Sequence, residues 1–278
     1  VIIKIKFIKT LNLCFLLLLV IAYSCSNNDE ISQEEKDTVL DASTKGSGVF
    51  SFTYKTTNRT KVLDVYYHIP QDKISTTPIL IVFHGVGRNA EDYRNAMIEK
   101  ADALGYIVIT PQFSQQNFPR GDGYNLGNVF VDGDNPSSST LNPEADWAFS
   151  IVEPLFDFVR LQVKNTNATY NIFGHSAGGQ FAHRFIMFKP NARVDKVITS
   201  ASGWYTFPDV SIPFPYGFDK SPLENMALAN LFSKHIYVQV GENDNDPNAS
   251  SLRHNDFADA QGLNRKERAI NFFNTANN

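Results

Sequence analysis

Short apolar runs and longer amphipathic stretches alternate along most of this chain. The continuous apolar runs are typical of strands buried on both faces of a sheet, and they occupy residues 78–83, 106–110, 168–173, 194–199 and 236–240. The stretches with helical spacing occupy residues 90–104, 143–163, 179–188, 221–232 and 264–275. Ahead of both sets, residues 49–54 and 62–69 are rich in β-forming residues and alternate, which predicts an antiparallel pair that opens the sheet. This order predicts an α/β fold with a mostly parallel, doubly wound sheet.

The first 25 residues have the pattern of an export signal. Lysines occur at positions 4, 6 and 9, and the apolar run 11–22 is short for a membrane span. The run ends at Ala22-Tyr23-Ser24-Cys25, which resembles a bacterial lipobox and implies lipidation of Cys25. The alternative is an ordinary signal peptide with an incidental cysteine. Residues 26–48 are polar and acidic, which predicts a flexible tether to the domain at 49–278.

Composition limits the function classes. The chain has 278 residues and a formal net charge of −4. Its first 25 residues contain lysines and no acidic residue, so the remainder is more acidic still. An acidic domain without a basic stripe argues against nucleic-acid binding. The two cysteines, Cys14 and Cys25, both precede the predicted domain, which must therefore be stabilised by its core and not by a disulfide.

The motif Gly174-His175-Ser176-Ala177-Gly178 matches G-x-S-x-G, the nucleophile elbow of serine hydrolases. It stands between a predicted strand and a predicted helix, which is the context that the motif requires and a chance match in a loop lacks. A serine hydroxyl needs a base and a stabilised oxyanion to act as a nucleophile. The motif therefore predicts Ser176 as nucleophile and the Ala177 N–H as one oxyanion donor.

Further motifs resemble the α/β-hydrolase family, from about residue 49 onwards. Within it the chain looks most like the esterases related to polyhydroxybutyrate depolymerases and to feruloyl or acetyl-xylan esterases. The residues that carry the resemblance are His84-Gly85-Val86-Gly87, Gly174 to Gly179, Gly203-Trp204-Tyr205 and Gly241-Glu242-Asn243-Asp244. It implies the Val86 N–H as the second oxyanion donor and Asp244 as the acid of the triad, with Glu242 and Asp246 as rivals.

The catalytic base is harder to assign. The chain order in this fold is serine, acid, histidine, and only His254 follows Asp244. The family histidine normally follows one more strand, so we expect a sheet that lacks its last strand, a C-terminally incomplete domain, and an exposed edge at residues 236–240. The alternative is that His254 serves as the base. The other histidines are expected to pack or form hydrogen bonds, and they are His68, His175, His183 and His235.

Two loops border the predicted site. The long loop 112–141 is one, and the segment after residue 199 supplies Trp204 and Tyr205 as candidate substrate-binding residues. The alternative for these aromatic residues, and for Phe207, Phe214, Tyr216 and Phe218, is a small core beneath a cap. Asp132-Gly133-Asp134-Asn135 and Asp244-Asn245-Asp246 hint at calcium, but neither has the glycine and distal glutamate of an EF-hand, so no metal and no cofactor is predicted.

The sequence thus predicts an exported serine carboxylesterase, lipid-anchored to an outer membrane or cell surface at Cys25, with a periplasmic or secreted protein as the alternative location. Its partner would be a small or polymer-borne ester substrate. The competing hypotheses are a non-catalytic surface lipoprotein of the same fold, used for binding, and a serine peptidase.

Overall fold

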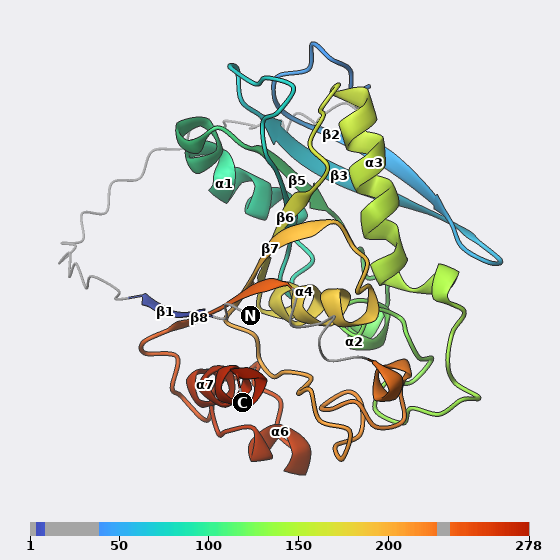
Figure 1. Cartoon of the computed structure of the whole chain (residues 1–278), viewed down its shortest axis with the longest axis vertical. Helices are drawn as coiled ribbons and strands as arrows, with labels where there is room; N and C mark the ends of the chain where they lie inside the picture. The colour runs from blue at the N-terminus through green and yellow to red at the C-terminus, as the bar shows by residue number, and fades with distance from the viewer. Residues whose placement is uncertain (1–3, 9–38, 227–233, 278) are drawn as a thin grey trace, which may run out of the picture.

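An eight-stranded sheet forms the centre of the molecule (Figure 1). The computed structural model describes residues 4–8, 39–226 and 234–277. The strands in chain order are β1 (Lys4–Ile8), β2 (Gly46–Lys55), β3 (Thr60–Ile69), β4 (Ile79–Phe83), β5 (Ile107–Pro111), β6 (Tyr170–His175), β7 (Val194–Ser200) and β8 (His235–Gly241). Their order across the sheet is β1-β8-β7-β6-β4-β5-β3-β2.

The pairing confirms the predicted doubly wound, mostly parallel sheet. Strands β2, β3 and β5 are joined by antiparallel pairing, and all other neighbours are parallel. The order changes direction at β4, which lies between β5 and β6. Loops at the carboxyl ends of strands on either side of such a switch point diverge and leave a crevice for ligands.

Helices cover both faces of the sheet (Figure 1). They are α1 (Ala90–Leu104), α2 (Arg120–Gly123), α3 (Val152–Gln162), α4 (Ala177–Phe188), α6 (Asp256–Ala260) and α7 (Arg265–Asn277), with short 3₁₀ turns η1 (Glu144–Asp146), η2 (Ala148–Ile151) and η3 (Pro222–Asn225). Successive side chains of β4 point to opposite faces of the sheet. Val82 packs against α1 in a small hydrophobic cluster. Ile81 and Phe83 point to the other face and belong to the main core, together with residues of α3 and α4.

Two predicted boundaries differ from the structure, and a third lies partly outside the described residues. The stretch 143–163 was expected to be one helix, but α3 begins only at Val152, because Trp147 adopts an extended backbone and buries its ring against Phe188. Strand β2 begins at Gly46 and Leu40 is already in the core, so the folded domain starts before residue 49. Of the helix expected at 221–232, the structure describes the turn η3, and residues 227–233 lie outside the described residues.

In the full chain the outer edge of β8 is paired with β1, which lies within the predicted export signal, so the exposed edge at 236–240 stays a prediction for the chain without that signal. Strand β1 runs parallel to β8, with Lys4 opposite Tyr237 and Ile8 opposite Gly241. This pairing gives hydrogen-bond partners to backbone groups that an edge strand leaves unpaired. The rest of the predicted export signal, including Cys25, lies outside the described residues.

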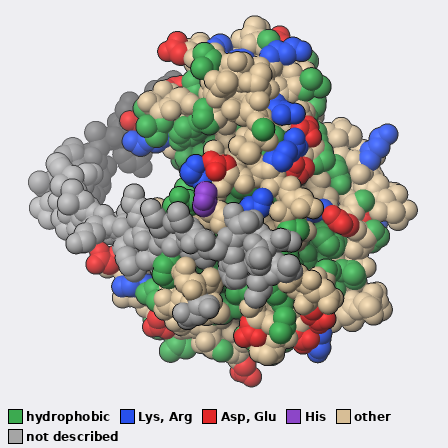
Figure 2. All heavy atoms as spheres, viewed as in Figure 1, with side chains coloured by type: hydrophobic (Ala, Val, Ile, Leu, Met, Phe, Trp, Pro, Cys, Tyr) green, Lys and Arg blue, Asp and Glu red, His purple; other side chains and the backbone are tan. Residues whose placement is uncertain are grey.

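The surface agrees with the charge composition. Figure 2 shows lysine, arginine and acidic side chains interspersed over the visible face. Within the ranges that the structure describes, no helix is both long enough and apolar enough to cross a membrane.

Candidate active site

Ser176 stands on a sharp turn between β6 and α4. Its backbone has φ +55° and ψ −116°, a strained conformation for a residue other than glycine. The flanking glycines are required by space: a Cβ on Gly174 would lie 2.1 Å from the Gly178 oxygen, and one on Gly178 would lie 2.0 Å from the Phe83 oxygen. The Ser176 N–H donates to the Ser200 oxygen at 2.8 Å, which ties the turn to β7. The turn therefore has the geometry of a nucleophile elbow.

The loop after β4 lies directly against this turn. A Cβ built on Gly85 would be 3.8 Å from the Cβ of Ser176. Val86 follows on an exposed stretch, and Ala177 is the first residue of α4. Within the described part of the chain, the N–H groups of Val86 and Ala177 have no hydrogen-bond partner. The two predicted oxyanion donors are thus brought to the neighbourhood of the serine.

His84 anchors the start of this loop. The Phe113 N–H donates to its Nε2 at 3.1 Å, so the ring proton resides on Nδ1, which donates to the Gly85 oxygen at 2.9 Å. The Tyr124 hydroxyl donates to the His84 oxygen at 2.7 Å. Burial lowers the pKa of His84 to about 4, so the ring is neutral near pH 7.

Arg88 anchors the other end of the loop. Its backbone has φ +57°, and its guanidinium donates to the oxygens of Phe113 and Arg120 while lying 4.5 Å from the centre of the Tyr124 ring. These contacts join the β4–α1 loop to the long loop after β5. We call the contacts of Arg88 and of the Tyr124 hydroxyl with this loop the clamp. Donors that stabilise an oxyanion are effective because they are held in place before the reaction, and the clamp holds this loop in place.

Asp244 lies in the loop after β8, at the position where the sequence analysis expected the acid. Its Oδ1 accepts from Arg265 Nη1 at 3.3 Å. It is also close enough to His175 to raise that pKa, although burial, aided by Arg265, lowers the pKa of His175 overall. The rival Asp246 is exposed and accepts from the Asn248 N–H in a local turn. Asp244 is therefore the better candidate by position.

Tyr93, which the sequence analysis missed, connects these parts. Its hydroxyl lies 2.7 Å from His175 Nδ1, and a Cβ on Gly85 would lie 2.8 Å from the same oxygen. Tyr93 thus touches both the residue before the nucleophile and the residue before the Val86 donor. No local motif marks it, because α1 brings it there only after the helix has packed on the sheet.

No described histidine occupies the position of a base. His254 contacts Asp259 Oδ1 and the Pro247 oxygen, both at 2.8 Å, so both ring nitrogens face acceptors. His183 is buried between the Gly179 oxygen and the Thr206 N–H. Among the described residues, none forms a hydrogen bond with the Ser176 hydroxyl.

Tyr205 lies in the core and not on the surface of the crevice, so its location disagrees with its predicted role in binding substrate. It is fully buried, its ring stacks on Phe272 at 4.5 Å, and its backbone is held on both sides by Gln261. Trp204 is also buried, 4.8 Å from the Tyr216 ring. These contacts favour the alternative of an aromatic core beneath a cap. The other aromatic residues of this segment are buried as well, which favours the same alternative for Phe207, Phe214, Tyr216 and Phe218.

Two arginines flank Trp204, with Arg184 at 4.2 Å and Arg253 at 5.1 Å from its ring centre. Arg184 is fully buried, and its Nε donates to Thr206 Oγ1 at 2.8 Å while its Nη2 has no partner among the described residues. Burial, aided by the charge of Arg253, lowers the pKa of Arg184 to about 9. Arg253 pairs with Asp134 at 2.6 Å. Neither arginine was singled out from the sequence, since neither belongs to a motif.

The aspartates that hinted at calcium are used within the protein. Asp132 accepts from the Asn135 side chain and from the Asp134 N–H, and Asp134 pairs with Arg253. In residues 39–226 and 234–277, no three histidine, cysteine or acidic side chains are grouped as metal ligands would be.

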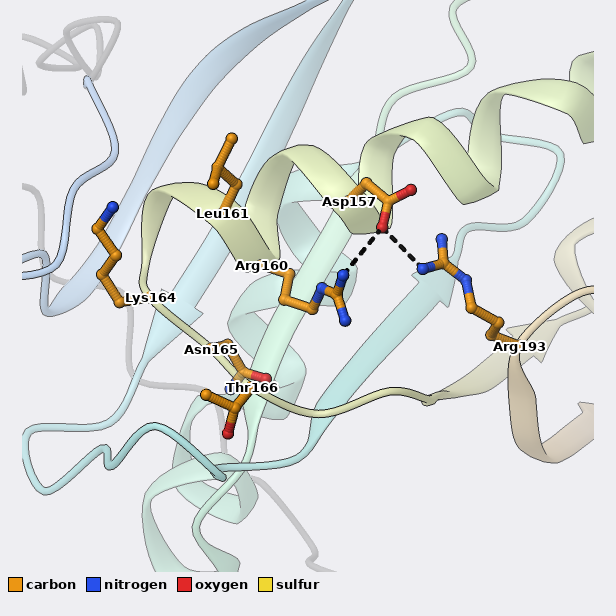
Figure 3. Close-up of a pocket in the computed structure, with 7 residues that line it drawn as sticks. All are labelled: Asp157, Arg160, Leu161, Lys164, Asn165, Thr166 and Arg193. Atoms are coloured by element: carbon orange, nitrogen blue, oxygen red, sulfur yellow. Dashed lines mark hydrogen bonds and ion pairs between the residues drawn. The ribbon is translucent and has the colours of Figure 1, made fainter.

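A cavity of about 660 Å³ opens at the other end of the sheet (Figure 3). Asp157 pairs there with Arg160 at 3.6 Å and with Arg193 at 2.8 Å. The segments that line it precede β6 and β7, whereas Ser176 follows the carboxyl end of β6. This cavity is therefore not part of the serine site.

Solved structures of two hydrolases are similar to this one. A poly(aspartic acid) hydrolase from Sphingomonas sp. KT-1 is 38% identical, with 84% of this chain and 85% of that chain covered and a TM-score of 0.76. A poly(3-hydroxybutyrate) depolymerase from Bordetella parapertussis is 27% identical, with 84% and 78% covered and a TM-score of 0.76. No family profile and no curated protein sequence matches the chain.

The chain belongs to the α/β-hydrolase family, and its relatives are hydrolases. This confirms the fold and the family that the sequence motifs predicted. The similarity does not by itself assign roles to Ser176, Asp244, Val86 or Ala177, which rest on the geometry described above.

Proposed function

We propose that this protein is a serine hydrolase that cleaves carboxylic esters through an acyl-enzyme on Ser176. The observation that carries the proposal is the strained turn at Ser176, packed against the Gly85–Val86 loop. Such strain persists only where the surrounding structure enforces it, and it is concentrated at functional sites. A protein that had lost its chemistry would have no need to retain either feature.

In the proposed reaction the Ser176 hydroxyl attacks the ester carbonyl and loses its proton to a histidine oriented by Asp244. The N–H groups of Val86 and Ala177 hold the oxyanion, and each donor of this kind is typically worth about 2.7–4 kcal/mol of barrier. The alcohol leaves with the proton, and water then hydrolyses the acyl-enzyme. Among the described histidines none forms a hydrogen bond with Ser176, and His254 contacts Asp259 and the Pro247 oxygen instead.

The substrate proposed is an ester carried on a polymer or a small molecule. One relative is a depolymerase of poly(3-hydroxybutyrate), which is a polyester. The other relative is a poly(aspartic acid) hydrolase, which makes a carboxylate-bearing polymer a second candidate substrate.

We further propose that the protein is exported and held at a membrane by a lipid on Cys25. The support is the lysine-rich start, the apolar run and the lipobox-like Ala22-Tyr23-Ser24-Cys25. Metabolic labelling with a fatty-acid probe tests this, with Cys25→Ser as the variant expected to lose the label.

The central test compares the protein expressed from its natural gene with its Ser176→Ala variant. Hydrolysis of a p-nitrophenyl ester and labelling by a fluorophosphonate probe should both be lost, whereas Ser137→Ala, a substitution in the long loop, should retain them. Unchanged ester hydrolysis in Ser176→Ala would refute the proposal. A folded wild-type protein that neither hydrolyses nor labels would support the alternative of a binding protein.

A further inference from the structure

A second serine, histidine and aspartate are joined by hydrogen bonds far from Ser176. Ser47 on β2 lies directly opposite His68 on β3, and its Oγ is 2.8 Å from His68 Nδ1. The other ring nitrogen, Nε2, is 2.9 Å from Oδ1 of Asp102 on α1. A nucleophile within reach of a base, with the base oriented by a third group, is the general arrangement of nucleophilic catalysis.

The hydrogen-bond partners determine which nitrogen carries the proton. An ionised carboxylate can only accept, so His68 Nε2–H donates to Asp102. In the neutral ring, Nδ1 then has a free lone pair and accepts from the Ser47 hydroxyl. The histidine is thus held in the tautomer that can remove a proton from the serine.

Ser47 is exposed to solvent, whereas the histidine beside it, His68, is buried. His68 is only 5% exposed, whereas Ser47 is exposed and lies between Gly46 and Gly48. The exposure of Ser47 leaves its side chain accessible to small molecules in solution. A cavity of about 270 Å³ is lined by His68 and Asp102 together with Lys73 and Gly105.

This cluster lies at the opposite end of the sheet from the site at Ser176. Ser176 follows the carboxyl end of β6, which is parallel to β4. Helix α1 starts after the carboxyl end of β4 and returns along the sheet, so Asp102 in its last turn lies near the start of β5. The cluster is therefore separate from the proposed esterase site and does not depend on it.

We propose that Ser47, His68 and Asp102 form a second nucleophilic site that accepts acyl groups from small activated carboxylic esters. Ser47 Oγ bonds to the ester carbonyl carbon, and its proton passes to His68 Nδ1. The bond from that carbon to the leaving oxygen then breaks, and the alcohol departs with the proton from His68. Water attacks the acyl-serine by the same route and releases the acid. Asp102 stabilises the imidazolium formed in each step.

The test uses p-nitrophenyl acetate on the Ser176→Ala variant, so that any acylation there is independent of the proposed esterase site. An aryl acetate is suitable because its good leaving group needs little stabilisation of the oxyanion. Trypsin separates Ser47, in the peptide 46–55, from Ser43, in the peptide 37–45. Ser43 is the matched control, because its hydroxyl donates to Asp41 and to no imidazole. Mass spectrometry over time gives both acetylation rates from one sample.

Since a positioned general base contributes about 10²–10⁴-fold, Ser47 should be acetylated on the order of 100-fold faster than Ser43. His68→Gln should remove that difference. If this buried variant fails to fold, Asp102→Ala on the exposed side of α1 serves instead, and it should slow Ser47 at least about tenfold. Equal rates at Ser47 and Ser43, or an unchanged Ser47 rate in a folded variant, would overturn the proposal and leave the cluster as a link between β2 and α1.

Discussion

Gly178 offers a direct test of how the nucleophile turn is built. An alanine Cβ at this position would lie 2.0 Å from the Phe83 oxygen, 2.5 Å from the Phe83 carbonyl carbon and 2.7 Å from the His84 oxygen. All three are backbone atoms of β4 and its loop, so no side chain can rotate away to relieve the contact. The strand and α4 must separate.

The size of the effect follows from two opposing terms. Overpacking a close contact costs about 1–3 kcal/mol and sometimes more, and a clash with backbone belongs at the upper end. Alanine favours a helix over glycine by about 1 kcal/mol, which offsets part of that cost. We therefore expect Gly178→Ala to lower the free energy of unfolding by about 2 kcal/mol or more. At about 2–4 °C per kcal/mol for a domain of this size, Tm should fall by roughly 4–8 °C.

The assay is urea and thermal unfolding followed by circular dichroism, with Gly203→Ala as the control. There the nearest atom to the new Cβ is the Gln180 side-chain nitrogen at 3.2 Å, which can shift, so the cost should stay below about 1 kcal/mol. Equal stabilities for Gly178→Ala and Gly203→Ala would refute the account of the turn. Because the displaced segment carries the oxyanion loop, Gly178→Ala should also lose esterase activity beyond its loss of stability.

The remaining predictions concern the clamp, the pH dependence and the base. Tyr124→Phe removes the donor to the buried His84 oxygen, so the free energy of unfolding should fall by about 1–3 kcal/mol in urea titrations, and no change would contradict the clamp. The folded pKa of His84, about 4, is below the ordinary value of 6.5, so the unfolded state binds the extra proton and stability should fall as pH falls from 6.5 to 4. His84→Gln should lose less stability than wild type over that interval, by up to about 3 kcal/mol, and equal losses would count against the shift. Both ring nitrogens of His254 face acceptors other than Ser176, so His254→Ala should leave the rate of p-nitrophenyl ester hydrolysis unchanged, and loss of that activity would show that His254 is the base.

The elements of the sheet were predictable from local pattern because buried parallel strands are uniformly apolar and amphipathic helices are periodic. Helix α1 has the bounds that the pattern predicts, Ala90–Leu104. The stretch 143–163 departs from its pattern because Trp147 gains more from burial against Phe188 than from helical backbone, and that partner is 41 positions away. A local pattern carries no information about such a contact.

The tight turn that carries the proposed nucleophile was predictable for a similar reason. Gly174, Ser176 and Gly178 are constrained by one tight turn, so their spacing in sequence is the spacing of the site. Tyr205 shows the limit of this reasoning. The local pattern of a tyrosine that follows a strand is the same whether its ring lines a crevice or lies in the core. Only the packing of Phe272 from α7 against the ring places Tyr205 in the core.

The sequence by itself determined the order of strands and helices, the elbow at Ser176 and the family, because each depends on residues close together in the chain. Only the tertiary structure decided what surrounds them: the clamp of Tyr124 and Arg88 on the oxyanion loop, Tyr93 beneath Gly85, the pairing of β1 with β8, and the meeting of Ser47, His68 and Asp102. Most of these contacts join residues tens to hundreds of positions apart. They form only when the sheet has twisted and the helices have packed, and hydrogen bonds of about 3 Å are then set by the fold and not by the spacing of residues along the chain.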